Sequence, residues 1–100
     1  MSLSPTLTAR VEQLMAACRD NKIKIATAES CSGGLIAGCI SAGAGSSDVG
    51  ERGFITYSNE AKSEMLGVPA ELILRVGAVS EEVSRAMAEG ALEHSRAHLT

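Results

Sequence analysis

Hydrophobic residues recur at helical spacing over the first twenty positions. Ser4 and Pro5 form a typical N-cap and first helical residue, and apolar side chains then stand three or four positions apart, at Leu7, Val11, Leu14, Met15 and Cys18. This spacing predicts an amphipathic helix, which Asn21 and Lys22 end. The apolar run that follows predicts a short strand over residues 24–28.

Small and polar residues dominate the next segment. Residues 27–34 carry hydroxyls, a thiol, a carboxylate and two glycines, and they lead into a second helical pattern over residues 33–42. A loop of small residues, Gly43-Ala44-Gly45-Ser46-Ser47, ends that helix. Where a strand passes into a helix in this way, free backbone N–H groups can bind an anion or an oxyanion. This segment is therefore the first candidate for chemistry.

The second half of the chain alternates a strand with helices. Residues 53–58 carry β-branched and aromatic side chains and predict a strand. Ser58 then caps a helix that Gly67 ends, a further helical turn runs from Pro69 to Gly77, and Ser80 caps a last helix with an apolar stripe at Val83, Met87 and Ala91. The order predicts one α/β domain over residues 1–100, with a mostly parallel sheet flanked by helices.

Composition narrows the class of protein. The chain has 100 residues, 45% hydrophobic and 21% charged, but only Phe54 and Tyr57 are aromatic, so its core is small and we expect a homo-oligomer. A net charge of −3 with scattered Lys and Arg disfavours a nucleic-acid partner. No segment approaches the roughly 20 apolar residues of a membrane span, and we expect a cytoplasmic protein.

Three cysteines without C-x-x-C spacing, Cys18, Cys31 and Cys39, favour reduced thiols over disulfides or zinc. His94 and His98 stand four apart on the last predicted helix, as metal ligands sometimes do, but no third ligand is evident. We therefore expect packing or surface roles for both histidines and no metal.

Three side chains supply the elements of an acyl-transfer site. Parallel strands place their carboxyl ends at one edge of a sheet, so Ser30 and Tyr57 are expected to be neighbours. Lys62 falls at the start of the following helix, where the helix dipole favours a neutral amine. Serine, tyrosine and lysine can act as nucleophile, proton relay and base without histidine.

Each of these residues also has an ordinary structural interpretation. Ser30 can cap the helix that follows it, Tyr57 can be a half-buried core aromatic, and Lys62 can be a solvated helix residue. Cys31 can be a thiol nucleophile or a buried inert thiol. Glu29 can orient Lys62 or a substrate amide, or it can form an ion pair with Arg52.

Several motifs, in order, resemble the C-terminal domain of the competence/damage-inducible CinA family. They are Thr27-Ala28-Glu29-Ser30-Cys31-Ser32-Gly33-Gly34, Gly45-Ser46-Ser47, Gly53-Phe54-Ile55-Thr56-Tyr57-Ser58-Asn59-Glu60-Ala61-Lys62, Leu66-Gly67-Val68 and Gly77-Ala78-Val79-Ser80. The resemblance implies a nicotinamide-nucleotide amidohydrolase, which converts nicotinamide mononucleotide to nicotinate mononucleotide and ammonia in pyridine-nucleotide salvage. It implies no metal or organic cofactor.

The resemblance also assigns roles to residues. Ser30 resembles the family's nucleophile, Lys62 the base and Tyr57 the residue that assists proton transfer. N–H groups around Ser32, Gly33 and Gly34 are then expected to stabilise the oxyanion. The expected substrate-binding residues are Cys31, Ser32, Gly33, Gly34, Gly45, Ser46 and Ser47, although Gly45-Ser46-Ser47 would look the same as an ordinary surface turn.

The resemblance places the family's next strand and a second glycine-rich loop after Thr100, so we expect the chain to lack the C-terminal portion of the domain. The alternative function is an inactive nucleotide-binding or oligomer-forming module derived from that domain. A redox-active thiol protein centred on Cys31 is a third possibility, although no resolving cysteine lies nearby in sequence.

Overall fold

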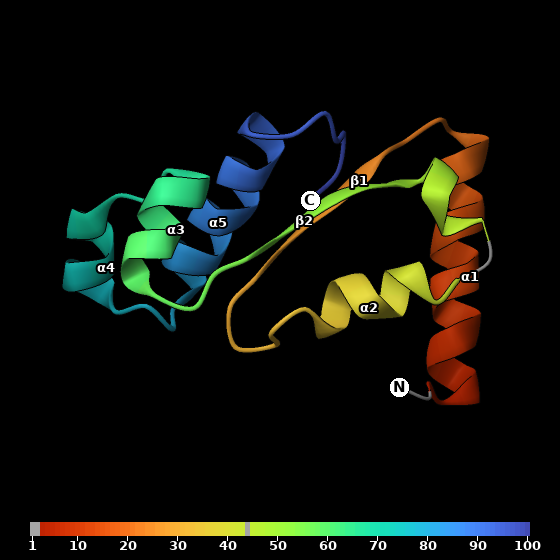
Figure 1. Cartoon of the computed structure of the whole chain (residues 1–100), viewed down its shortest axis with the longest axis horizontal. Helices are drawn as coiled ribbons and strands as arrows, with labels where there is room; N and C mark the ends of the chain where they lie inside the picture. Colours follow the sequence, from red (N-terminus) through yellow and green to blue (C-terminus); the bar gives the residue numbers. More distant parts are fainter. Residues whose placement is uncertain (1–2, 44) are drawn as a thin grey trace.

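The computed structural model describes residues 3–43 and 45–100. Its elements, in chain order, are α1 (Pro5–Asp20), β1 (Ile25–Glu29), α2 (Leu35–Ser41), the 3₁₀ turn η1 (Ser46–Asp48), β2 (Gly50–Ile55), α3 (Asn59–Leu66), α4 (Ala70–Val76) and α5 (Glu81–Glu93). Helices flank a pair of parallel strands (Figure 1). The predicted α/β class is confirmed.

The strand pair is the axis of the molecule. β1 runs parallel to β2, from the partners Ile25 and Gly50 to Glu29 and Ile55. The bounds predicted for the second strand, residues 53–58, are wrong. β2 begins three residues before Gly53 and ends at Ile55. On the other edge of β1, Leu99 forms a parallel bridge with Ile25. β1 thus has a neighbour on each side.

Three of the helices start at the predicted serines. Each serine Oγ accepts a hydrogen bond from the N–H three residues ahead: Ser4 from Leu7 at 3.1 Å, Ser58 from Ala61 at 3.0 Å and Ser80 from Val83 at 3.2 Å. Gly67, with φ 67°, ends α3 as predicted. The three predicted N-caps and the predicted C-cap are thus confirmed. They could be predicted because each depends on residues close by in the sequence.

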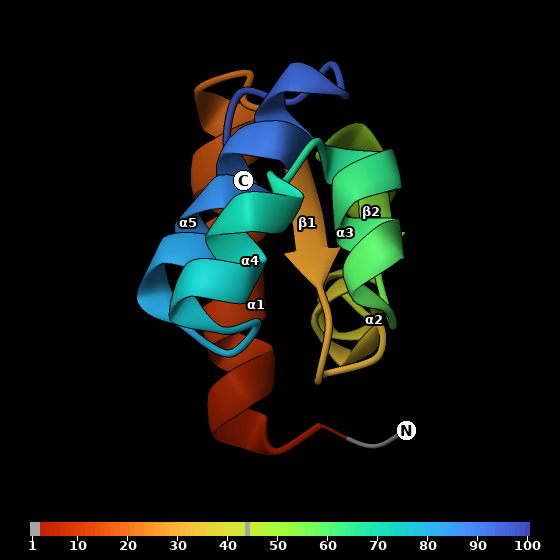
Figure 2. The ribbon, with the colours of Figure 1, turned by 90° about the vertical axis from the view of Figure 1, so that its left-hand side faces the viewer.

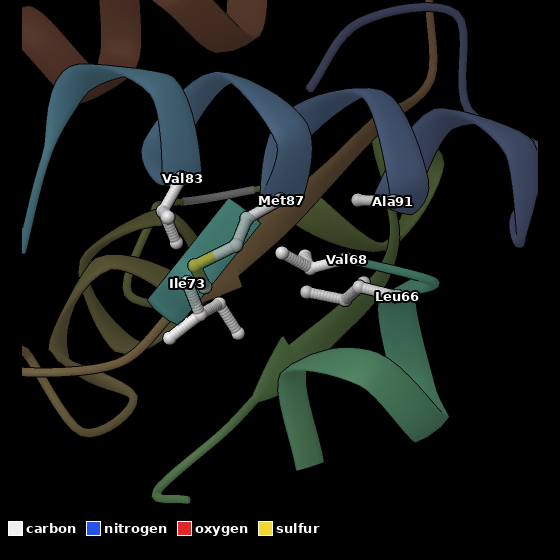
Figure 3. Close-up of a cluster of buried hydrophobic side chains, with 6 residues drawn as sticks. All are labelled: Leu66, Val68, Ile73, Val83, Met87 and Ala91. Atoms are coloured by element: carbon white, nitrogen blue, oxygen red, sulfur yellow. The ribbon is translucent and has the colours of Figure 1, made fainter. Parts of the chain in front are cut away.

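The larger hydrophobic cluster lies among α3, α4 and α5, at one end of the strand pair. It consists of Leu66, Val68, Ile73, Val83, Met87 and Ala91 (Figure 3). α5 approaches α3 so closely that a Cβ added at Gly90 would run into the carbonyl oxygen of Leu66. Seen from this end, β1 lies between α5 and α3 (Figure 2).

A smaller cluster lies at the opposite end, where α1 packs on the amino ends of the strands (Figure 1). It consists of Val11, Met15, Cys18, Ile25 and Val49. Leu7 and Leu14, which were also predicted in the stripe of this helix, stay 41% and 39% exposed. No helix in the described part of the chain is long and apolar enough to cross a membrane.

Candidate active site

Ser30 follows β1 directly and lines an open pocket of about 310 Å³. The turn after β1 forms one wall, with Ser30, Cys31 and Ser32. The opposite wall comes from the segment that enters α5, with Ser80, and from α5 itself, with Ser84. The pocket therefore lies at the carboxyl edge of the parallel strands, where ligands of α/β proteins usually bind.

The Ser30 side chain is half-buried and does not cap α2. The N-cap residue of that helix is Gly34, which has no side chain to cap it, and the Ser30 Oγ lies 4.0 Å from the Cys31 Sγ. The interpretation of Ser30 as a helix cap is therefore wrong. Cys31 is exposed, so the interpretation of it as a buried thiol is also wrong.

Glu29 takes the capping role. Its carboxylate, on a side chain that is 2% exposed, accepts hydrogen bonds from four donors: the Ser32 hydroxyl at 2.8 Å and the N–H groups of Gly34, Ile36 and Ala37 at 3.1, 2.9 and 3.0 Å. Burial alone would raise the pKa of this carboxyl, but the four hydrogen bonds outweigh burial and lower the pKa below its ordinary value of 4.5.

This arrangement replaces the expected roles of Glu29. The carboxylate that pairs with Arg52 belongs to Glu51, with Nε and Oε2 2.7 Å apart, so the expected Glu29–Arg52 ion pair is wrong. The N–H groups at the start of α2 were expected to be free to bind an anion or an oxyanion. Those of Gly34, Ile36 and Ala37 donate to the carboxylate of Glu29 instead.

Two of the expected oxyanion donors are engaged inside the turn. The Gly33 N–H donates to the Ser30 carbonyl at 3.1 Å, and the Gly34 N–H donates to Glu29. Gly33 and Gly34 both have positive φ, 61° and 101°, which shortens the predicted helix so that it starts at Leu35. Among the described hydrogen bonds of this turn, none uses the N–H of Cys31 or Ser32.

Tyr57 comes to the same edge of the sheet as Ser30. The residue before it, Thr56, donates its N–H and its hydroxyl to the carbonyl oxygen of Glu29, at 2.8 and 3.1 Å. Ser30 and Tyr57 thus directly follow two residues that are hydrogen-bonded across the strands. Tyr57 is 84% exposed, so the interpretation of it as a half-buried core aromatic is wrong.

Lys62 is buried on α3 and only 3% exposed, one turn before Leu66 on the same face of the helix. The interpretation of it as a solvated lysine is therefore wrong. Neither Tyr57 nor Lys62 lines the pocket at Ser30. The structure brings Ser30, Cys31 and Ser32 together in that pocket and places Tyr57 at the same edge.

The loop that precedes β2 lies at the other edge. Gly45 accepts a hydrogen bond from Arg19 at 3.1 Å, and Ser47 lines a separate cavity between α2 and the strands. The length of β1, roughly 16 Å, separates this edge from Ser30. The structure therefore does not bring Gly45 and Ser47 together with Ser30. Ala44 and the side chain of Ser46 lie outside the described residues.

The two histidines have backbone partners. α5 ends at Glu93, so His94 and His98 do not share the face of a helix. The His94 Nδ1 lies 2.8 Å from the Gly90 carbonyl oxygen, and the His98 Nδ1 accepts the Lys24 N–H at 2.9 Å. Within residues 3–43 and 45–100, no group of three or more His, Cys, Asp or Glu side chains is placed to hold a metal ion.

The sequence analysis did not predict Ser84 or Thr56, and it gave Glu29 other roles than the one observed. Ser84 lies on the wall of the Ser30 pocket, Thr56 ties the two strand ends together, and Glu29 fixes the start of α2. A signal for Glu29 exists in the sequence: a helix that starts after Gly33-Gly34 has no capping side chain of its own, and a carboxylate stands just upstream.

These features define an α/β domain with a half-buried serine on a strand-to-helix turn, at the carboxyl edge of parallel strands. The CinA C-terminal domain model matches residues 7–100. The chain belongs to the CinA C-terminal domain family.

Relatives agree with this assignment. A CinA-like protein of Akkermansia muciniphila is 50% identical over 95 residues, which are 95% of this chain and 23% of that protein. The crystal structure of competence/damage inducible protein CihA from Agrobacterium tumefaciens is 46% identical with a TM-score of 0.92, over 97% of this chain and 59% of that one. A CinA superfamily structure from Escherichia coli is 31% identical with a TM-score of 0.89, over 97% and 58% of the two chains. The chain thus spans less than two thirds of each relative.

Proposed function

We propose that the Ser30 pocket is the acylation site of a nicotinamide-nucleotide amidohydrolase. The observation that carries the proposal is the Ser30 hydroxyl, which lines an open pocket at the carboxyl edge of the strands and does not cap α2. Membership of the CinA family supports it, as does the position of Tyr57 at the same edge.

In this mechanism the Ser30 Oγ attacks the carboxamide carbon of nicotinamide mononucleotide. By the roles that the family resemblance assigns, its proton passes to the Lys62 amine, assisted by Tyr57, which requires both side chains to reach the pocket from its rim. Negative charge develops on the carboxamide oxygen, where the N–H groups of Cys31 and Ser32 can donate to it. The C–N bond then breaks, and ammonia leaves with the proton that Lys62 held. Water hydrolyses the resulting ester, which releases nicotinate mononucleotide and restores the serine.

Ammonia release from nicotinamide mononucleotide tests the proposal, with the parent chain, Ser30→Ala and Cys31→Ser compared in the presence of a metal chelator. We expect release by the parent and by Cys31→Ser, and none by Ser30→Ala, because only the serine forms the ester. Loss with Cys31→Ser alone would instead indicate a thiol protein. No release from a folded parent would contradict the proposal for this chain.

A second candidate is a module that binds a nucleotide or forms an oligomer without turnover. Apolar side chains around the Ser30 turn favour it, since Leu35, Ile36 and Ile55 are 57%, 48% and 40% exposed and Ile55 lies against Gly34. Such a patch is typical of a contact with another copy. Sedimentation velocity of the parent and of Leu35→Glu tests this candidate: a dimer that the variant dissociates supports it, and a monomeric parent opposes it.

A further inference from the structure

We infer that Glu29 is a positioning residue for this site, because its buried carboxylate fixes the turn that carries Ser30. The inference rests on the proposed function in so far as it gives Ser30 the attacking role. The carboxylate of Glu29 reaches across the turn and accepts hydrogen bonds from Ser32, Gly34, Ile36 and Ala37, all at 2.8–3.1 Å. One side chain thus joins the end of β1 to the first turn of α2.

The backbone of Glu29 is held just as firmly from the other side. Its carbonyl oxygen accepts both the N–H and the hydroxyl of Thr56, a residue with no exposed surface. Thr56 precedes Tyr57, and Glu29 precedes Ser30. Glu29 therefore links the residue before Tyr57 through its carbonyl group and the start of α2 through its carboxylate, with Ser30 directly after it.

Besides the contacts of Glu29, the described structure holds the turn by two backbone hydrogen bonds, from the Gly33 N–H to the Ser30 carbonyl oxygen and from the Leu35 N–H to the Ser32 carbonyl oxygen, both at 3.1 Å. Gly33 and Gly34 have positive φ and no side chains, and none of the seven residues of α2 is buried. A helix this short has little stability of its own. A glutamine at position 29 would lose the charge and turn an amide NH₂ group toward N–H donors, so the turn would be free to adopt other conformations.

The same contacts restrict where the substrate can bind. The carboxylate of Glu29 occupies the N–H groups at the start of α2, so the phosphate of a mononucleotide has no place there. The effect expected from loss of Glu29 is accordingly on the geometry of attack rather than on substrate binding. A displacement of about 1 Å at a reacting atom costs about 100-fold in rate.

The test compares the parent with Glu29→Gln, Glu29→Asp and the control Glu51→Gln. Glu51 also accepts a backbone N–H, that of Arg96, and pairs with Arg52, but it lies at the amino end of the sheet. Two quantities are measured for each protein: kcat and KM for ammonia release from nicotinamide mononucleotide, and amide hydrogen exchange resolved by residue.

For Glu29→Gln we expect kcat to fall about 100-fold with KM near that of the parent, and exchange to quicken at Gly34, Ile36 and Ala37 but not at Met87 in α5. Glu29→Asp keeps the charge and should regain part of kcat. Glu51→Gln should leave kcat and KM unchanged, and it should leave amide exchange at Gly34, Ile36 and Ala37 unchanged.

Parental kcat in Glu29→Gln would overturn the inference, and so would a loss carried by KM alone. If Glu29→Gln loses protection throughout α5, Glu29→Asp decides: a folded aspartate variant with reduced kcat and quicker exchange confined to α2 supports positioning, and one identical to the parent overturns it. If the parent itself releases no ammonia, the proposed function fails. Exchange then decides alone, since quicker exchange limited to the start of α2 supports the fixing role of Glu29 and unchanged exchange contradicts it.

Discussion

Two helices, α5 and α2, both begin at the Ser30 pocket, but different forces hold them. α5 has thirteen residues, a Ser80 cap and a buried face formed by Val83, Met87, Gly90 and Ala91. α2 has seven residues, of which none is buried, and its first turn is bound by the carboxylate of Glu29. Packing stabilises the first helix, whereas one buried charge fixes the second.

The difference shows how a small domain can separate stability from the precision of a site. Apolar contacts along α5 are spread over several side chains and are not directional, so they tolerate small shifts. The hydrogen bonds to Glu29 are directional and converge on one group, so they define the position of a turn at low cost in buried area. The candidate nucleophile, Ser30, lies on the turn that the hydrogen bonds to Glu29 fix.

The largest expected effect on stability comes from disrupting the packing of α5 against α3. Gly90→Ala places a methyl group against the carbonyl oxygen of Leu66, so we expect the free energy of unfolding to fall by about 3 kcal/mol. Urea unfolding followed by circular dichroism measures it. The exposed neighbour Glu89→Ala is the control, with a change of no more than about 0.5 kcal/mol. Equal stability of the two variants would show that α3 and α5 do not meet at Gly90.

The next largest effect on stability comes from removing the charge of Glu29. Glu29→Gln is expected to lower the free energy of unfolding by about 2 kcal/mol at pH 7, because hydrogen bonds to a buried ionised group are lost. The pKa of Glu29 is lowered in the folded state, so its contribution is present above the unfolded value of 4.5 and disappears as the pH falls through the folded value. Unfolding of both proteins between pH 7 and pH 2 checks this. A difference that does not depend on pH would contradict the role of the charge.

The smallest effects on stability come from removing the hydroxyl group of Ser80 or of Ser30, and they differ between the two serines. Ser80 accepts the Val83 N–H and caps α5, so Ser80→Ala should cost about 1 kcal/mol. Ser30 caps nothing, and Ser30→Ala should change stability by less than about 0.5 kcal/mol. Thermal unfolding of the two variants side by side measures both. Equal losses would mean that Ser30 does contribute to the start of α2.

Local chemistry explains which parts of the fold the sequence predicts. Ser4, Ser58, Ser80 and Gly67 act through groups within four residues of themselves, and each was predicted correctly. The first three residues of β2, Gly50-Glu51-Arg52, have no strand signal of their own and are extended because they pair with β1.

The candidate site follows the same rule. The parallel topology predicts that Ser30 and Tyr57 share an edge of the sheet, and the structure agrees. The role of Glu29 involves donors up to eight residues away across a turn with positive φ, which spacing alone does not predict. The burial of Lys62 depends on how α3 packs, and that also lies beyond local pattern.

The contact between the amino end of β1 and residues 98–99 bears on how the chain folds as it is made. Lys24 donates its N–H to His98, 74 positions later, and Leu99 then pairs with Ile25 beside β1. At a synthesis rate of about 5–20 residues per second, one edge of β1 waits roughly 4–15 s for this neighbour. α1 can form within microseconds of its emergence, since it needs only local contacts. The ribosome therefore presents a completed first helix well before the strand that follows it has its second partner.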